Sequence, residues 1–188
     1  VNNIDRIVWL YKLSPSTINI KDGVNVHDIT FFEITLKNKI YPNDLFTFID
    51  KNIPRHLIFL ANYLDQSKFL INYKKQNNCQ DKTFSIIKTF SSSWQSNTSI
   101  KLSIEGKNLD CAYLNFLLQI SGINLNDIQN IDEAIELKTK SEHLELRIKK
   151  LSHRIKNEIQ FNRKIELNNL LKILIKEQTT IEQSLNNL

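Results

Sequence analysis

The stretch DITFFEITLKN, from Asp28 to Asn38, gives the clearest indication of the fold class. Its side chains alternate between apolar and polar, with Phe32, Ile34 and Leu36 as the apolar set. This alternation predicts a β-strand with one buried face and one solvated face. Sheets that are wet on one face are usually antiparallel. The stretch therefore predicts a mainly antiparallel sheet.

Similar patterns on both sides of this stretch extend the predicted sheet. Further strands are predicted at Arg6–Leu13, His56–Tyr63, Phe69–Lys75, Thr83–Phe90 and Ile100–Ile104. In the first of them, Trp9, Tyr11 and Leu13 are expected to share one face. Asp65-Gln66-Ser67 is expected to form a hairpin turn, and Gln76–Lys82 a polar loop.

Two helices are predicted beside this sheet. The first is Pro42–Ile53, because proline is favoured in a first helical turn and Pro54 stops the helix. The second is Asn108–Ser121, where Asn108 or Asp110 is expected to cap the first turn. Gly122 follows directly, at the position where helices often end in a left-handed glycine.

The last third of the chain has a different character. From Ile131 to Leu188 there is no glycine or proline, and apolar residues follow two heptad seams. The first seam consists of Leu144, Ile148, Leu151 and Ile155, and the second of Leu167, Leu171, Leu174, Ile181, Leu185 and Leu188. On a straight helix the second seam is rotated by roughly 100° from the first. One rod could not present both seams to one partner.

A helical hairpin folded about Phe161 would bring the two seams together. It pairs Ile155 with Leu167 and Leu151 with Leu171. A bent continuous helix is the alternative, because Gln160–Lys164 lacks the glycine or proline common in tight turns. The predicted architecture is an α+β domain at residues 1–127, with a mainly antiparallel sheet and flanking helices. A C-terminal, coiled-coil-like hairpin arm is predicted at residues 128–188.

The composition is that of an ordinary globular protein. Of 188 residues, 41% are hydrophobic and 24% charged, close to globular averages. No apolar run approaches the ~20 residues needed to cross a bilayer, and no secretory signal is recognisable, so a cytoplasmic protein with no membrane contact is expected. Because the chain starts at Val1 and has no methionine, a preceding native stretch is also expected. Cys79 and Cys111 are isolated, which disfavours a thiolate zinc site.

Familiar enzyme motifs are missing from the sequence. Three glycines cannot build a phosphate loop or a dinucleotide fingerprint, and no nucleophile elbow occurs. The four histidines are scattered, so a surface role rather than metal ligation is expected for His27, His56, His143 and His153. No cofactor is expected.

A metal-dependent nuclease is the one enzymatic alternative that the sequence suggests. Restriction-type nucleases have an Asp followed by Glu-x-Lys on a strand, with the Glu and Lys side chains on one face, and these residues hold Mg²⁺ and orient water. Here Asp28 precedes Glu33, but position 35 is threonine and the lysine is Lys37. A solvated strand face with a cross-strand ion pair is the simpler interpretation.

The strongest functional signal is a basic segment in the arm. Seven cations fall between Arg147 and Lys164 against the single acid Glu158: Arg147, Lys149, Lys150, Arg154, Lys156, Arg163 and Lys164. On a hairpin these residues would gather toward the tip, where they could contact phosphates without reading sequence. The competing interpretation is a solvated helix face in a lysine-rich chain.

Several short motifs resemble one bacterial family. Ile4–Trp9, Lys12–Pro15, Phe32–Lys37, Ile53-Pro54 and Gln160–Asn168 are similar to the family catalogued as domain of unknown function 4391. Its genes often neighbour helicase and DNA-methyltransferase genes of restriction-like modules. The resemblance implies an accessory role in DNA processing or phage defence and supplies no catalytic residues.

The sequence thus predicts a non-catalytic accessory subunit. It would dock a helicase or methyltransferase component through protein contacts, and its basic arm would contact nucleic acid. Two alternatives remain at this point. One is a nuclease with an unrecognised metal site near Glu33, and the other is a structural module that forms a homodimer through the seams.

Overall fold

The computed structural model describes residues 3–42, 44–78, 81–123 and 131–186. The chain divides into two compact units, Val1–Gly122 and Ile123–Leu188. The predicted domain boundary between residues 127 and 128 lies outside the described residues. Each unit has its own core and is described by itself below.

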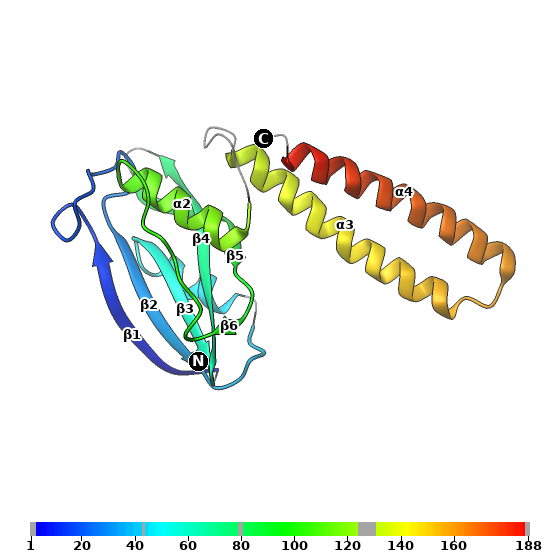
Figure 1. Cartoon of the computed structure of the whole chain (residues 1–188), viewed down its shortest axis with the longest axis horizontal. Helices are drawn as coiled ribbons and strands as arrows, with labels where there is room; N and C mark the ends of the chain where they lie inside the picture. Colours follow the sequence, from blue (N-terminus) through cyan, green and yellow to red (C-terminus); the bar gives the residue numbers. More distant parts are fainter. Residues whose placement is uncertain (1–2, 43, 79–80, 124–130, 187–188) are drawn as a thin grey trace. The chain divides into compact units, whose positions relative to one another are not determined.

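The first unit is built on a mixed sheet (Figure 1). Its strands are β1 (Ile4–Leu13), β2 (Ile29–Leu36), β3 (His56–Tyr63), β4 (Gln66–Asn78), β5 (Asp81–Ser91) and β6 (Gln95–Ser96). They are ordered β1-β2-β3-β4-β5, and the short β6 pairs with β4. All neighbours are antiparallel except β2 and β3. The prediction of an α+β fold with a mainly antiparallel sheet is confirmed.

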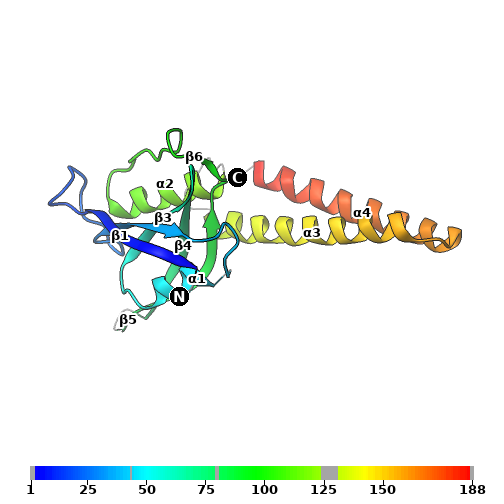
Figure 2. The same cartoon turned by 90° about the horizontal axis from the view of Figure 1, so that it is seen from below.

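The two faces of the sheet are covered by different helices. Figure 2 shows α1 (Leu45–Lys51) below the sheet and α2 (Leu109–Ser121) above it. On the α1 face, Phe46 contacts Phe59 at 5.3 Å between ring centroids. On the α2 face, Phe31 meets Phe116 edge to face at 5.5 Å. Burying each such side chain contributes roughly 1.5–3 kcal/mol, so both faces hold the unit together.

The α1 segment provides the crossover that makes β2 and β3 parallel. It lies between them in the chain, and parallel neighbours require such a connection. The helix is shorter than the predicted Pro42–Ile53, because its regular hydrogen bonding starts only at Leu45 and ends at Lys51.

The second helix, α2, begins and ends as its sequence predicts. The Asn108 side chain accepts the backbone N–H of Cys111 at 2.9 Å, and Gly122 ends the helix with a φ of 65°. Asp110 has a different task. Its carboxylate accepts the backbone N–H groups of Val24, Asn25 and Val26 at 2.6–3.1 Å, which closes the loop after β1 onto α2.

Three local predictions in the sheet are wrong. Ile100–Ile104 is not a strand, because the Gln119 side chain, rather than a neighbouring strand, accepts the Ser103 N–H and donates to its carbonyl. Part of the predicted polar loop Gln76–Lys82 belongs to strands, since β4 runs to Asn78 and β5 starts at Asp81. The β3–β4 turn consists of residues 64–65, so it starts one position earlier than predicted and is one residue shorter.

The predicted alternation along β1 is broken. Its pairing with β2 shifts register between Ile4 and Arg6 and again between Trp9 and Tyr11. Such bulges insert an extra residue and turn the following side chains to the other face. Trp9 therefore pairs with Phe32 and is 63% exposed, whereas Tyr11 stacks on Phe31 at 4.6 Å.

The second unit is a helical hairpin, so the continuous-helix alternative is wrong. It consists of α3 (Ile131–Asn157) and α4 (Phe161–Asn186), which lie side by side in Figures 1 and 2. Leu144 and Ile155 on α3 and Leu174 on α4 are buried. The other described members of the two seams are half-buried; Leu188 lies outside the described residues. The seams thus pack on each other within the arm.

None of the helices that the structure describes is both long enough and apolar enough to cross a membrane.

Candidate functional site

The seven basic residues predicted from the sequence gather near the turn of the arm. Five lie on the last three turns of α3, and Arg163 and Lys164 lie at the start of α4. All seven side chains are exposed. The hairpin therefore brings the cations of two helices to one end of the arm, and we call this exposed set the basic tip: Arg147, Lys149, Lys150, Arg154, Lys156, Arg163 and Lys164.

The α3 cations avoid the seam because of their heptad positions. Ile148, Leu151 and Ile155 face α4, which leaves Lys149 and Lys156 on the outward side. These two lysines, with Leu146, Lys150, Ser152 and His153, line a shallow open depression on that side of α3. The same periodicity that builds the hairpin thus directs the cations to solvent.

Most of the basic tip is electrostatically unneutralised. Arg163 contacts Glu158, with 3.6 Å between Nε and Oε2. Within the described ranges, the other six cations make no ion pair with a carboxylate. A cluster of solvated cations on a rigid helix pair attracts polyanions, and each phosphate that it contacts releases a condensed counterion.

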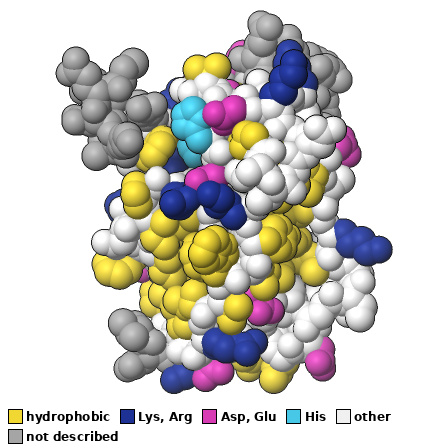
Figure 3. Space-filling view, turned by 90° about the vertical axis from the view of Figure 1, so that its left-hand side faces the viewer, with side chains coloured by type: hydrophobic (Ala, Val, Ile, Leu, Met, Phe, Trp, Pro, Cys, Tyr) yellow, Lys and Arg dark blue, Asp and Glu magenta, His cyan; other side chains and the backbone are white. Residues whose placement is uncertain are grey.

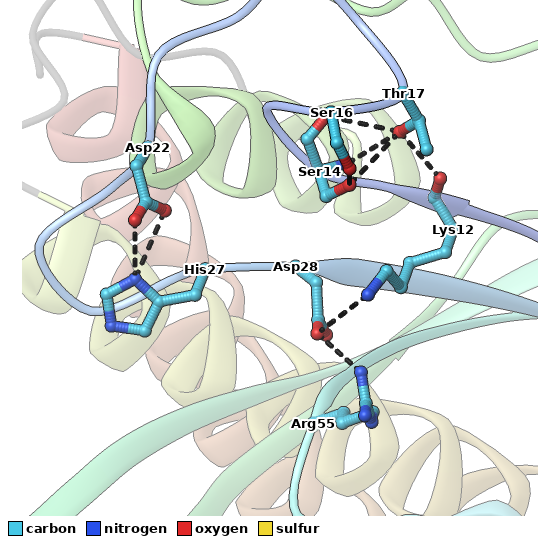
Figure 4. Close-up of polar contacts among 8 residues, drawn as sticks. All are labelled: Lys12, Ser14, Ser16, Thr17, Asp22, His27, Asp28 and Arg55. Atoms are coloured by element: carbon cyan, nitrogen blue, oxygen red, sulfur yellow. Dashed lines mark hydrogen bonds and ion pairs between the residues drawn. The ribbon is translucent and has the colours of Figure 1, made fainter.

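The sheet unit contains a second polar cluster, at the end of β1 and the starts of β2 and β3. Figure 4 shows Lys12 and Arg55 converging on Asp28. Oδ2 of Asp28 lies 3.6 Å from Nζ of Lys12 and 2.5 Å from Nη1 of Arg55. Nearby, His27 contacts Asp22 at 3.1 Å. The carboxylate of Asp28 is thus occupied by two cations, so it ties three strand ends together.

Glu33, the residue on which the nuclease hypothesis depends, also has side-chain partners on neighbouring strands. It pairs with Arg6 of β1 at 3.8 Å and accepts a hydrogen bond from Asn62 of β3 at 2.6 Å. The predicted cross-strand ion pair is therefore confirmed. In the part of the chain that the structure describes, no three His, Cys, Asp or Glu side chains come close enough to hold a metal ion. Cys79 is not in that part.

A buried charged pair was not anticipated from the sequence. Asp50 of α1 contacts Lys74 of β4 at 2.6 Å, and both side chains are almost fully buried. Asn72 donates to the other oxygen of Asp50 at 2.6 Å, and Lys74 also donates to the Arg55 carbonyl. Burial raises the pKa of the Asp50 carboxyl and lowers that of the Lys74 amine, while the opposite charge of each partner counteracts the shift.

The Asp50–Lys74 pair borders a cavity of about 240 Å³, lined also by Ile53, Pro54 and Phe84. Perturbed ionisable groups beside a cavity are one mark of a functional site. Here, however, both Asp50 oxygens and the Lys74 amine already have partners within the protein. The pair is therefore best understood as the polar anchor of α1 on the sheet.

The predicted surface role of His56 is wrong. It is 6% exposed, and its ring packs edge to face against Phe84 and Tyr113 at 5.1 and 4.7 Å. Burial, with the nearby positive charge of Lys74, lowers the pKa of His56 to about 4. His27, His143 and His153 are exposed, as predicted.

Comparison with known proteins places the chain in a family. The family model described as Domain of unknown function (DUF4391) matches residues 1–177, so the chain belongs to this family. No curated protein and no solved structure matches it.

Proposed function

We propose that this member of the domain-of-unknown-function 4391 family is a non-catalytic accessory subunit of a DNA-processing or phage-defence system. The basic tip binds nucleic acid through phosphate contacts. The sheet unit docks a protein partner, of which a helicase or methyltransferase component is the leading candidate. The nucleic acid contact is the part of the proposal with the most direct support.

One observation carries the nucleic acid contact. Seven exposed cations from two helices lie at the turn end of the arm, and only Arg163 among them is paired with a carboxylate in the described part of the chain. Solvated surface cations are common singly, but a concentrated set on one rigid element supports sequence-independent phosphate binding.

The protein contact is supported by the free edge of the sheet. Within the described residues, β1 pairs only with β2. Four of its apolar residues are 39–63% exposed: Ile7, Trp9, Leu10 and Tyr11. Figure 3, which looks onto the β1 side, shows apolar side chains gathered into a patch. A strand edge with apolar side chains is suited to an added strand of a partner protein.

The nucleic acid proposal is tested by a DNA-binding titration at several salt concentrations. A tip variant, with Lys149, Lys150, Arg154 and Lys156 changed to Gln, is compared with the unchanged chain. The control variant changes Lys37, Lys51, Lys101 and Lys107 of the sheet unit, all exposed, to Gln. Both variants lose four positive charges, so only the position of the lost charge differs.

The unchanged chain should bind duplex DNA with an affinity that falls steeply with salt. The tip variant should bind weakly, and the slope of log K against log salt should shrink by about one for each lost phosphate contact. The control variant should behave like the unchanged chain. Absence of binding at low salt, or equal losses in both variants, would contradict the proposal. Magnesium-dependent cleavage would instead support the nuclease alternative.

The protein contact is tested by co-purification with candidate helicase and methyltransferase components. Changing Ile7 and Trp9 to Ser should abolish co-purification while DNA binding stays intact. As a control, Val24 and Ile40 are changed to Ser, because they are 82% and 88% exposed but lie outside β1. Retention of the partner by the β1 variant would reject the edge as the docking surface.

A further inference from the structure

The turn of the arm exposes two large apolar side chains. Ile159 lies in the three-residue connection between α3 and α4 and is 95% exposed. Phe161, the first residue of α4, is 75% exposed. Exposure of two such side chains at one point is costly in water. It is therefore a feature that a bound partner would explain.

The turn holds these side chains in place through Glu158. One oxygen of its carboxylate accepts the backbone N–H groups of Ile159 and Gln160, both at 3.1 Å. The other contacts Arg163, and the Lys164 N–H donates to the Gln160 carbonyl at 2.9 Å. The only acid of the basic segment thus braces the turn, and the apolar pair is preorganised to point outward.

Cations surround this apolar pair along the chain. Arg154 and Lys156 precede it on α3, and Arg163 and Lys164 follow it on α4. A complementary binding partner would carry negative charges for these cations to contact. It would also have an apolar surface, accessible between those charges, for Ile159 and Phe161. A nucleic acid with unstacked bases has both, because apolar wedge residues such as Phe and Ile insert between base steps while cations contact the phosphates.

An anionic membrane offers the same two chemistries, but the positions of the cations favour nucleic acid. Arg147 lies ten residues before Asn157, about 15 Å along α3. Interfacial helices bury their apolar face only about 5–10 Å into a bilayer. If the tip inserted to this depth, Arg147 would remain above the lipid headgroups. A strand that lies along the arm would contact it.

We propose that Ile159 and Phe161 form an apolar wedge that inserts beside unpaired bases. The arm therefore prefers a duplex with a mismatched bubble or a single-stranded junction over a fully paired duplex. This inference rests on the proposed function, because the phosphate contacts of the basic tip bring the wedge to the nucleic acid.

The test measures the affinity of the full chain for three probes: a short duplex, the same duplex with a central mismatched bubble, and phosphatidylcholine vesicles containing phosphatidylserine. The wedge variant changes Ile159 and Phe161 to Ser. The control variant changes Ile173 and Ile175 of α4 to Ser, since they are also exposed, by 63% and 47%. Equal helical ellipticity of all three proteins checks that the arm is folded.

The unchanged chain and the control variant should bind the bubble more tightly than the duplex. The wedge variant should lose about five- to a hundredfold in affinity for the bubble, the range expected for base stacking. Its affinity for the duplex and its salt dependence should not change. Failure of the unchanged chain to bind either DNA would reject the proposed function itself.

Two other results would overturn the wedge while leaving the phosphate contacts standing. One is equal affinity of the unchanged chain for bubble and duplex, or a bubble affinity that the wedge variant retains. The other is vesicle binding that the wedge variant alone loses, with DNA binding unaffected, which would assign the tip to an anionic membrane.

Discussion

At the scale of single residues, the sheet unit is most sensitive where charge is buried. Asp50 and Lys74 satisfy one another inside the layer between α1 and the sheet. Such a pair adds little net stability over a well-packed apolar pair, but removing one partner leaves an uncompensated charge. The Asp50–Lys74 pair instead fixes the position of α1 on the sheet.

Changing Asp50 to Asn should therefore lower the free energy of unfolding by about 3–5 kcal/mol. Denaturant unfolding followed by tryptophan fluorescence measures this, because Trp9 and Trp94 both lie in the sheet unit. Asp44→Asn is the control, since Asp44 is exposed and its side chain makes no capping hydrogen bond. It should cost less than about 0.5 kcal/mol. Similar losses in both variants would argue against a special role for the pair.

His56 should make the sheet unit less stable in weak acid. Its pKa is lowered from 6.5 to about 4 in the folded state, so the folded protein binds its proton only at lower pH. As the pH falls from about 6.5 to about 4, the unfolded chain takes up a proton that the folded chain does not. Over this range stability should fall by roughly 3 kcal/mol.

The His56→Phe variant should lack this loss, because phenylalanine keeps the ring packing but does not titrate. His143→Phe, at an exposed site of the arm, should retain it. Urea unfolding at pH 7 and at pH 4.5 compares the three proteins. Equal pH dependence in His56→Phe and the unchanged chain would assign the effect to other groups.

At the scale of elements, the arm depends on a narrow seam. Leu144, Ile155 and Leu174 are its buried members, while Ile165, Leu170 and Ile173 of α4 are 43–63% exposed. A thin seam supports two helices of 27 and 26 residues. A single charge within it should therefore disrupt the hairpin.

The variant Leu174→Asp should lose helical ellipticity and DNA affinity together, because the basic tip requires both helices. Tryptophan fluorescence should stay native, since neither tryptophan lies in the arm. Ile173→Asp is the control, because its side chain is 63% exposed and its helix should remain. Persistent DNA binding by an unfolded arm would show that the hairpin is not needed to present the cations.

The elements that local sequence specifies were predicted best. The cap and glycine of α2 and the out-of-phase seams of the arm act over a few residues, so their structures could be derived from the sequence. The prediction of a strand at Ile100–Ile104 was wrong, because an alternating pattern does not ensure that a neighbouring strand is available for pairing. The β1 bulges and the parallel pairing of β2 with β3 were not predicted, because they depend on strands that are distant in the sequence.

The residues of the candidate sites were likewise predicted only where the signal is local in the sequence. The cations of the basic tip were visible because they are close in sequence, and heptad positions placed them on the outside. The Asp50–Lys74 pair was not visible, because its members are 24 residues apart and meet only when α1 packs on β4. The buried state of His56 likewise follows from Tyr113, which α2 brings from a distant part of the chain.

At the scale of the whole molecule, charge is segregated along the arm. Residues 147–164 carry seven cations and one acid, whereas residues 123–146 carry two cations and six acids. A general bias toward lysine would enrich cations throughout and would not separate them from acids. The segregation therefore favours a positive tip that attracts polyanions over a uniformly solvated face.

The two acids in the first turn of α3, Asp132 and Glu133, should oppose nucleic acid binding only when salt is low. Asp132 lies 22 residues before Arg154, about 33 Å along α3. The Debye length is about 30 Å at 0.01 M salt but about 8 Å at 0.15 M. Changing Asp132 to Asn and Glu133 to Gln should thus raise DNA affinity at the lower salt concentration and leave it unchanged at the higher one. An equal gain at both concentrations would mean that the nucleic acid extends along the arm as far as the first turn of α3.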